Sequence, residues 1–323
     1  MTVFSTIITA PGALSLPAAR LAAAFALMLL GLGFMVAGLV LLIKALKRRG
    51  PEREAAPAAA AEEAEHIKEK RLFVAADSQL GDRKNQQDSC GYAAELSAEQ
   101  EKMGVLGVVC DGMGGMEGGE LASRICAETI YNGYYQLGEA EDICAVLREL
   151  VIEADREVAA LCDSEGRKLN SGTTAVAAVV CRGRAYWVST GDSRIYHIHG
   201  GTVRQLTRDH NLKLKLLEAA AMGRISFEEA QSHPQREALI SYVGKGGDLI
   251  VDTGIVPFEP DSGDMLLLCS DGVYKVLDNN RVLSLAMDCL EDPTQAAALI
   301  ARTAVNTGNI KHDNTTVLVF CYK

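Results

Sequence analysis

An uncharged run near the N-terminus constrains this chain most, because it separates a segment suited to lipid from residues that can fold in water. From Leu21 to Ile43 the sequence reads LAAAFALMLLGLGFMVAGLVLLI, twenty-three residues without a charged side chain. About twenty apolar residues in a helix suffice to cross a bilayer. A cleaved signal peptide and a buried core helix are the alternatives, but the run is long for a signal peptide and only Arg20 precedes it as a basic residue. The pattern predicts one transmembrane helix.

Basic residues immediately follow this run, at Lys44, Lys47, Arg48 and Arg49. An excess of Lys and Arg on one side of a span predicts that this side faces the cytoplasm. The next residues are rich in Ala, Glu and Lys without an apolar face, which is typical of a solvated tether. We therefore expect a single-pass protein of the cell membrane with its globular domain in the cytoplasm. The expected segments are a short extracytoplasmic N-terminus (1–20), the transmembrane helix (21–43), a basic juxtamembrane and charged linker (44–70) and one globular domain (71–323).

Charge and cysteine content exclude some function classes. The formal net charge of -10 and a pI near 5.2 argue against a non-specific nucleic-acid binder, which concentrates Lys and Arg against phosphates. The nine cysteines include no C-x-x-C pair, so neither a zinc clamp nor dithiol chemistry is indicated. Scattered single cysteines indicate reduced thiols in a cytosolic compartment.

Short apolar runs punctuated by Gly and Asp fill the globular region and predict strands and turns. Gly at Arg182-Gly183 and at Gly200-Gly201 favours tight hairpins, and therefore antiparallel sheets. Apolar residues at three- and four-residue spacing predict paired helices between groups of strands, which indicates an α+β fold. The expected strands are 72–76, 105–110, 173–181, 184–190, 194–198, 202–206, 265–269 and 315–321. The expected helices are 120–135, 141–162, 279–289 and 294–306.

Four aspartates carry the chemistry, each at the end of an apolar strand or beside the start of one: Asp111, Asp192, Asp271 and Asp313. A single Asp-Gly after a strand is more often a turn former than a functional residue. Four carboxylates directed to one edge of a sheet, however, would repel one another unless cations lay between them. Oxygen ligands without a His or Cys cluster favour hard ions, so we expect Mg²⁺ or Mn²⁺.

Six motifs in order give the chain a family resemblance: Arg83-x-x-x-Gln87-Asp88, Asp111-Gly112-Met113-Gly114-Gly115, Ser171-Gly172-Thr173-Thr174, Gly191-Asp192-Ser193-Arg194, Ser270-Asp271-Gly272 and Asp313-Asn314-Thr315-Thr316. Together they resemble the PPM-type metal-dependent protein serine/threonine phosphatases of bacteria, over nearly all of residues 71–323. The resemblance implies an αββα sandwich of two antiparallel sheets flanked by helix pairs. It also implies phosphorylated protein substrates, and a Ser/Thr protein kinase system as the opposing partner.

The resemblance also implies roles for individual residues. Asp111 would bridge two metal ions, with the carbonyl of Gly112, Asp271 and Asp313 as further ligands. Asp88 belongs to the same metal-binding set, and Asp192 with Asp271 would hold a possible third ion. Arg83 would bind the substrate phosphate through two parallel hydrogen bonds. A hydroxide bridging the metals would attack phosphorus directly.

Two residues depart from the family pattern. Gln87 stands where many relatives have a carboxylate that binds metal-bound water, so we expect a slower or more metal-demanding enzyme. Met113 stands where animal relatives have a His proposed as general acid, although many bacterial members also have Met. The alternative to an active phosphatase is a catalytically weakened phosphoprotein-binding module of the same fold, and a small-molecule phosphoesterase is a third possibility.

Overall fold

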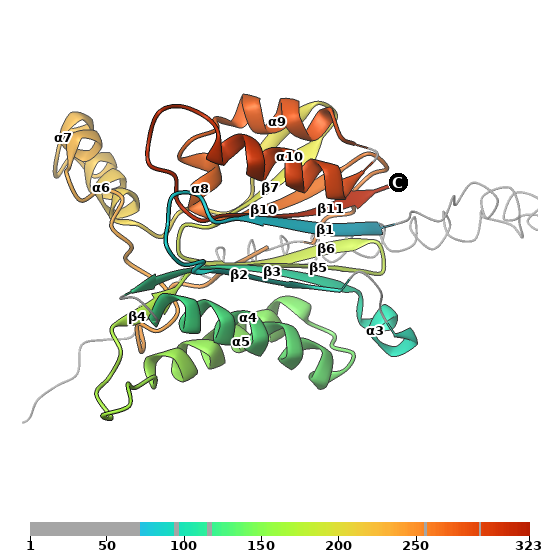
Figure 1. Ribbon diagram of the computed structural model, residues 1–323, viewed down its shortest axis with the longest axis horizontal. Helices are drawn as coiled ribbons and strands as arrows, with labels where there is room; N and C mark the ends of the chain where they lie inside the picture. Colours follow the sequence, from blue (N-terminus) through green and yellow to red (C-terminus); the bar gives the residue numbers. More distant parts are fainter. Residues whose placement is uncertain (1–71, 94–96, 115–117, 255–256, 291) are drawn as a thin grey trace, which may run out of the picture. The chain divides into compact units, whose positions relative to one another are not determined.

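Two antiparallel sheets lie face to face at the centre of the fold, with helices on both outer faces (Figure 1). The computed structural model describes residues 72–93, 97–114, 118–254, 257–290 and 292–323. The expected αββα sandwich is confirmed for this part of the chain. The predicted span at 21–43 and the segments predicted on either side of it, residues 1–20 and 44–70, lie outside the described residues. None of the described helices combines the length and apolar character needed to cross a bilayer.

The first sheet has five strands in the spatial order β1, β11, β10, β7, β8. Strand β11 pairs antiparallel with both β1 and β10, so the last strand of the chain lies inside the sheet rather than at its edge. The bounds of these strands are Leu72–Gln79 (β1), Arg194–His199 (β7), Thr202–Gln205 (β8), Met265–Cys269 (β10) and Thr315–Tyr322 (β11).

The second sheet has the spatial order β2, β3, β5, β6, β9, and a short β4 pairs with the far end of β3. Its bounds are Asp88–Tyr92 (β2), Val105–Gly114 (β3), Ser171–Thr173 (β4), Ala175–Cys181 (β5), Arg184–Thr190 (β6) and Asp252–Thr253 (β9). The predicted strands at 184–190 and 265–269 match their observed bounds, and the other predicted strands, apart from that at 173–181, are recovered with shifted ends.

Successive side chains of a strand point to opposite faces of the sheet. In the central strands both faces are apolar, so the side chains form three apolar layers. In β10, Leu266 and Leu268 pack between the two sheets, while Met265 and Leu267 pack against the outer helices. Strand β11 follows the same rule, with Phe320 in the layer between the sheets. Strands buried on both faces therefore read as continuous apolar runs in the sequence.

Helix pairs cover the outer faces: α4 and α5 pack on the second sheet, and α9 and α10 on the first (Figure 1). Helices α5, α9 and α10 each begin after an Asp whose side chain accepts backbone N–H groups, namely Asp142, Asp278 and Asp292. The helix bounds are Ala98–Met103 (α3), Gly118–Leu137 (α4), Ile143–Ala159 (α5), Leu212–Ala221 (α6), Phe227–Ser232 (α7), Asp271–Tyr274 (α8), Asn279–Met287 (α9) and Pro293–Val305 (α10).

The observed hairpin turns agree with those predicted from the sequence. Arg182 and Gly183 have φ values of 52° and 75°, and Gly200 and Gly201 have 54° and 73°, as the tight primed turns of hairpins require.

One difference concerns the predicted strand at 173–181, which the structure divides at Thr174 into β4 and β5. Strand β2 was not predicted, because its sequence DSCGY shows no apolar alternation.

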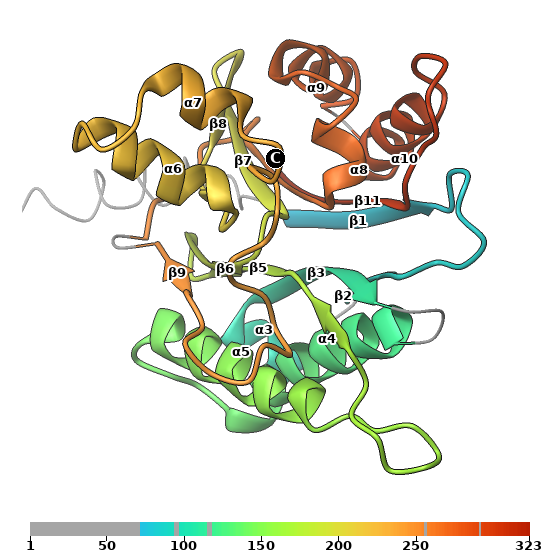
Figure 2. The ribbon, with the colours of Figure 1, turned by 90° about the vertical axis from the view of Figure 1, so that its left-hand side faces the viewer.

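Helices α6 and α7 lie outside the layered core. They connect β8 to β9 and stand beyond the sheet end at which β10 meets α8 (Figure 1), on the side of β7 and β8 (Figure 2). Helix α7 begins with a capping box in which Ser226 and Glu229 bond each other's backbone N–H groups. Only Ala220 of α6 and Ala230 of α7 are buried, so this helical flap is held to the domain by few apolar contacts.

The layer between the sheets predicts a stability effect. Phe320 is fully buried there, so Phe320→Ala should lower the free energy of unfolding by about 3–5 kcal/mol in urea denaturation. Phe227→Ala is the matched control, because Phe227 is 58% exposed at the start of α7, and its effect should stay within about 0.5 kcal/mol. Equal effects of the two substitutions would contradict the assigned core.

Candidate active site

The structure brings the predicted aspartates together at one end of the two sheets. Asp111 lies near the end of β3, and Asp88, the first residue of β2, is its partner in the β2–β3 register. From the other sheet, Asp271 begins α8 directly after β10, and Asp313 comes just before β11. Asp192 occupies the turn between β6 and β7. Both sheets therefore supply carboxylates to one cluster, which we call the aspartate cluster.

Mutual repulsion is evident in the proton affinities of the aspartate cluster. Burial, followed by the negative charges of Asp88, Asp271, Asp192 and Asp313, raises the pKa of Asp111 well above its usual value. The residue Asp111 keeps some exposed surface, but protein surrounds its carboxylate, so burial is the main cause of the raised pKa. Burial likewise raises the pKa of Asp88 to about 7, and burial together with Asp271 raises that of Asp192 to about 6. The cluster holds more negative charge than its surroundings neutralise.

The Ser-Gly-Thr-Thr motif positions two of these aspartates. Thr174 accepts a hydrogen bond from the Asp111 N–H at its Oγ1, 3.0 Å away, and its own N–H donates to the Asp111 carbonyl at 2.9 Å. The same hydroxyl lies 2.6 Å from the hydroxyl of Ser193, the residue after Asp192. Thr174 therefore joins the end of β3 to the β6–β7 turn, which explains why the strand is interrupted there.

Two polar side chains tie the sheets together beside the cluster. The Ser270 hydroxyl donates to Asp88 Oδ2 at 2.7 Å and accepts from the Thr316 N–H at 2.9 Å. Asn314 accepts the Gln87 N–H at 2.9 Å and donates to the Leu80 carbonyl at 2.9 Å. Sequence reasoning placed Ser270 and Asn314 in motifs but assigned them no role, because neither is charged.

Close backbone approach explains the glycine after Asp111. A Cβ on Gly112 would lie 2.1 Å from the Gly119 carbonyl oxygen and 2.5 Å from that of Gln87, far inside contact distance. The Gly112 N–H donates to the Gln87 carbonyl at 3.0 Å. The Gln87 side chain itself lies against Gly119 near the start of α4. The backbone of Gln87 is therefore fixed, while its amide faces the N-terminus of a helix.

Two cations border the cluster. Arg83, with a half-exposed side chain, forms an ion pair with Asp313, and Lys275 forms one with Asp271 four residues earlier. Arg83 was predicted as a site residue. Lys275 was not, although an i,i+4 position after a cluster aspartate in a short helix was a usable signal. Each cation neutralises a carboxylate that would otherwise repel its neighbours.

These residues fit divalent cations. The donor set consists of carboxylate oxygens with nearby backbone carbonyls, which are the ligands that Mg²⁺ and Mn²⁺ prefer. Asp88 Oδ1 is buried without a hydrogen-bond partner among the described residues, as expected of an oxygen directed at an ion or its water. Cations between the carboxylates would offset the like-charge repulsion that adds to burial in raising the pKa values of Asp111 and Asp192.

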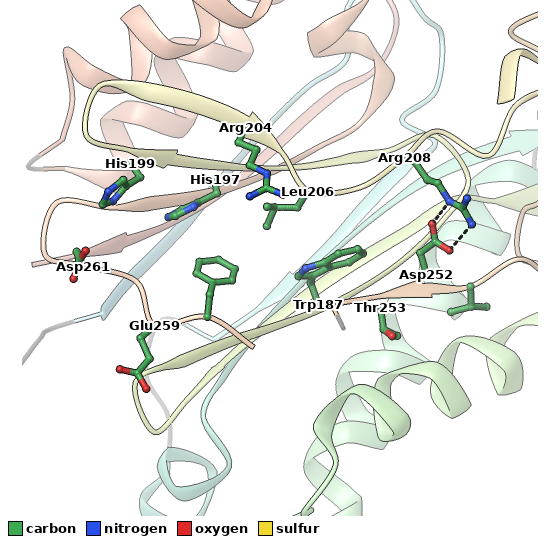
Figure 3. Close-up of a pocket in the computed structure, with 13 residues that line it drawn as sticks. Trp187, His197, His199, Arg204, Leu206, Arg208, Asp252, Thr253, Glu259 and Asp261 are labelled. Atoms are coloured by element: carbon green, nitrogen blue, oxygen red, sulfur yellow. Dashed lines mark hydrogen bonds and ion pairs between the residues drawn. The ribbon is translucent and has the colours of Figure 1, made fainter. Parts of the chain in front are cut away.

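A cavity of about 970 Å³ lies away from the aspartate cluster, between the edges of the two sheets (Figure 3). Trp187, His197, Arg204 and Phe258 are among the residues lining it. Trp187 is partly buried there and packs against the apolar layer between the sheets. None of the cluster aspartates lines this cavity, so the chemistry of the aspartate cluster identifies the candidate active site better than cavity size does.

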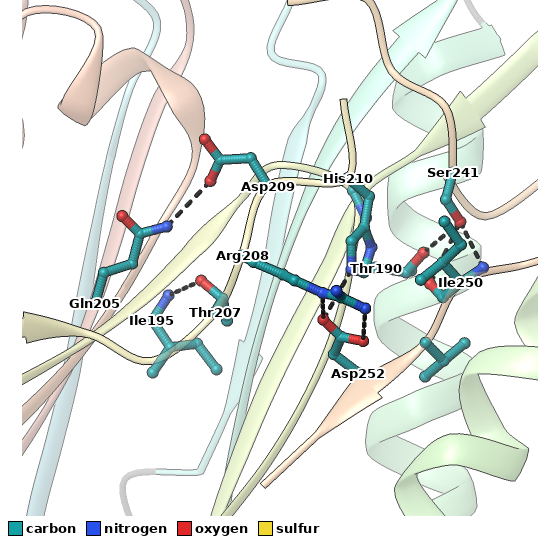
Figure 4. Close-up of polar contacts among 12 residues, drawn as sticks. Thr190, Ile195, Gln205, Thr207, Arg208, Asp209, His210, Ser241, Ile250 and Asp252 are labelled. Carbon is teal, nitrogen blue, oxygen red and sulfur yellow. Dashed lines mark hydrogen bonds and ion pairs between the residues drawn. The ribbon is translucent and has the colours of Figure 1, made fainter. Parts of the chain in front are cut away.

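The segment before the helical flap reaches back to the cluster. Arg208 and His210 both contact Asp252 of β9, His210 through Nε2 at 3.0 Å (Figure 4). His210 Nδ1 accepts the Gly191 N–H at 3.2 Å, and the His210 N–H donates to the Gly191 carbonyl at 2.8 Å. Because Gly191 precedes Asp192, His210 fixes the turn that carries this aspartate.

Comparison with known proteins gives consistent matches. A family model described as protein phosphatase 2C matches residues 77–303. The serine/threonine phosphatase stp of Listeria welshimeri is 33% identical over 215 residues, which cover 66% of this chain and 82% of the relative. Protein phosphatase PhpP of Streptococcus pneumoniae is 31% identical over 215 residues, covering 65% of this chain and 82% of the relative.

Solved structures show the same relationship. The serine/threonine phosphatase PstP/Ppp of Mycobacterium tuberculosis superposes with a TM-score of 0.63 at 30% identity, covering 77% of this chain and 98% of that one. A catalytic domain of PstP in complex with two manganese ions gives a TM-score of 0.63 at 27% identity, with 78% and 98% coverage. The chain thus belongs to the protein phosphatase 2C family of PPM-type, metal-dependent enzymes, and it is a protein serine/threonine phosphatase.

Proposed function

We propose that the aspartate cluster binds two Mn²⁺ or Mg²⁺ ions and that the site hydrolyses phosphoserine and phosphothreonine in proteins. The observation that carries this proposal is the convergence of Asp111 and four other carboxylates from both sheets at one sheet end. Burial and these four carboxylates together raise the pKa of Asp111. When bound, the two ions would activate water, so that hydroxide could serve as the nucleophile, and they would offset the charge of the phosphoryl oxygens. The residues of the chain hold, orient and shield this arrangement.

Asp111 is the proposed bridging ligand, because it lies in the middle of the set and is affected by every other cluster carboxylate. Asp271 and Asp313 approach from the first sheet, and Asp88 and the Gly112 carbonyl from the second. Ligands from both sheets would make ion binding depend on the relative position of the sheets. The Ser270 bridge to Asp88 supports that position directly.

Arg83 is the proposed phosphate-binding residue. Its guanidinium pairs with Asp313 at the exposed edge of the cluster, where an incoming phosphate would compete for the same donors. Two parallel hydrogen bonds from a guanidinium to a phosphate are a geometry that Lys cannot reproduce. Met113 offers no proton, so the leaving serine or threonine oxygen would be protonated by water in the site.

A third ion between Asp192 and Asp271 remains part of the proposal, and Lys275 would compete with it. The Lys275 ammonium pairs with Asp271 and is affected by the charge of Asp192. A cation arriving there must displace this ammonium, so the third position should be weaker than the first two.

A catalytically weakened phosphoprotein-binding module is the alternative, and Gln87 is its support. It is disfavoured because a binding module has no need for five carboxylates at one sheet end, an arrangement that repulsion makes costly without metal. Hydrolysis of small phosphate esters as the main activity is disfavoured by the names of the relatives alone. Competition between a phosphothreonine peptide and p-nitrophenyl phosphate distinguishes protein phosphatase activity from small-ester hydrolysis.

We also propose that residues 21–43 anchor the enzyme in the cell membrane with the phosphatase domain in the cytoplasm. The uncharged run followed by four basic residues supports this proposal. A cytoplasmic domain would meet proteins phosphorylated by a Ser/Thr protein kinase system, the proposed source of substrate.

The metal proposal predicts that hydrolysis of a phosphothreonine peptide requires added Mn²⁺ or Mg²⁺ and stops in EDTA. Asp111→Asn should lower kcat by at least about a hundredfold, because an amide cannot hold two cations. It should leave the melting temperature in EDTA unchanged or higher, because it removes a repelling charge. Asp278→Asn is the control, since Asn also caps a helix and this residue lies outside the cluster. Activity that persists in chelator would overturn the mechanism.

Gln87→Glu tests the departure from the family pattern. A carboxylate near the ions should reduce the Mn²⁺ concentration for half-maximal activity by about tenfold. The same change on the exposed end of α4, Gln136→Glu, should have no effect. Unchanged metal dependence with a raised KM would instead show that the new carboxylate pairs with Arg83 or with the start of α4.

The membrane proposal predicts that the full chain sediments with membranes and that a chain beginning at residue 69 does not. A reporter fused after Lys323 should be active in the cytoplasm. Replacing Lys44, Lys47, Arg48 and Arg49 by Gln should weaken this orientation. Reporter activity outside the cytoplasm in the unmodified chain would refute the assigned orientation.

A further inference from the structure

Two histidines and an aspartate meet at the other end of the first sheet. We propose that His197, His199 and Asp264 form a site for one Zn²⁺-type transition-metal ion, separate from the aspartate cluster. Their potential ligand atoms all lie within 4.8 Å of one another. The proposal goes beyond the phosphatase reaction, and none of its residues belongs to the proposed catalytic machinery.

The register of two strands creates this grouping. His197 and His199 are two residues apart on β7, so both rings project from one face of the strand. Strand β10 pairs with β7 so that Met265 lies opposite Ile198, which brings the preceding Asp264 beside the histidines. His197 Nε2 lies 2.9 Å from Asp264 Oδ2, and His199 Nδ1 lies 2.8 Å from Oδ1.

The carboxylate between the rings is buried. The side chain of Asp264 is 5% exposed, and its Oδ2 also accepts the Asp261 N–H at 2.9 Å. Each of its two oxygens lies within hydrogen-bond distance of one imidazole nitrogen. A buried carboxylate therefore faces two imidazoles, and each imidazole shares a hydrogen-bonded proton with it.

A metal ion can replace those shared protons. Zn²⁺ binds imidazole nitrogen and carboxylate oxygen at about 2.0–2.2 Å, which places tetrahedral ligands about 3.3 Å apart. Both nitrogen-to-oxygen distances are shorter than this value, so the rings would move slightly away from the carboxylate to admit an ion. His197 is held against Phe258 with 4.7 Å between ring centres, whereas His199 is 54% exposed and free to turn toward an ion. One fixed and one adjustable ligand suit binding from solvent.

The cavity between the sheet edges gives access to the site. His197, His199 and Asp261 all line it (Figure 3). A fourth coordination position would therefore open to water or to the Asp261 carboxylate. Glu259 lines the same cavity but pairs with Arg184, so it is less available as a ligand. Three protein ligands and one open position are compatible with zinc.

Ligand chemistry separates this site from the aspartate cluster. Asp264 lies just before β10 and Asp271 just after it, and five extended residues span roughly 17 Å. The cluster offers oxygen ligands, which suit Mg²⁺, whereas two imidazoles favour Zn²⁺ over Mg²⁺. An excess of Mg²⁺ should therefore occupy the cluster and leave the histidine site open to zinc.

The test is a Zn²⁺ titration of the purified full-length chain in excess Mg²⁺, with bound zinc measured against a chromophoric chelator. The unmodified chain should bind one more Zn²⁺ than the His197→Gln/His199→Gln variant. The single variant His199→Gln should bind that ion at least about tenfold more weakly. Zinc should also raise the melting temperature of the unmodified chain more than that of the variants, because an ion that binds the folded state stabilises it.

His233→Gln is the matched control, because His233 follows α7 of the helical flap and its Nδ1 accepts the Gln235 N–H within a local turn. This control should retain the full zinc stoichiometry. His199→Gln should fold normally, since its ring is half exposed, and should keep its Mg²⁺-dependent phosphatase activity. Equal zinc stoichiometry and affinity in the unmodified chain and in the folded His199→Gln variant would overturn the proposal.

Discussion

Repulsion among carboxylates that the fold forces together is the constraint on which this domain depends. Asp111 and Asp88 come from one sheet, and Asp271 and Asp313 from the other, so the sandwich cannot close without bringing like charges together. Arg83 and Lys275 each neutralise one carboxylate at the border, but Asp111 has no such partner among the described ion pairs. The electrostatic repulsion among these carboxylates favours the binding of cations between them.

Packing and chemistry are joined by the same strands. The alternation that buries Leu266 and Leu268 between the sheets also directs the end of β10 to the cluster. At that point apolar packing gives way to the Ser270 hydroxyl, which bonds a residue from each sheet. The apolar layer therefore sets the distance between the sheets. The hydrogen bonds of Ser270 then fix the positions of the side chains at the aspartate cluster.

Much of this arrangement was predictable from the sequence, because apolar runs and glycine turns have short-range causes. The runs at 184–190 and 265–269 matched their strands, and the aspartates at strand ends were recognisable by position. Strand β2 was not predictable, since the burial of Asp88 depends on a partner strand and on Ser270, nearly two hundred residues away. The grouping of His197, His199 and Asp264 was missed for the same reason, because only strand register brings these residues together. Lys275 was missed although its spacing of four residues from Asp271 is a local signal.

The interior position of β11 has a consequence for how the enzyme is made. This strand lies between β1 and β10, so the first and last strands of the domain are neighbours, and Asp313 directly precedes it. During synthesis β1 has no pairing partner in its sheet until the residues of β11 have left the ribosome. The second sheet, whose strands all precede residue 254, can form earlier. A nascent chain that lacks β11 also lacks Asp313, so the aspartate cluster cannot be complete before this strand is made.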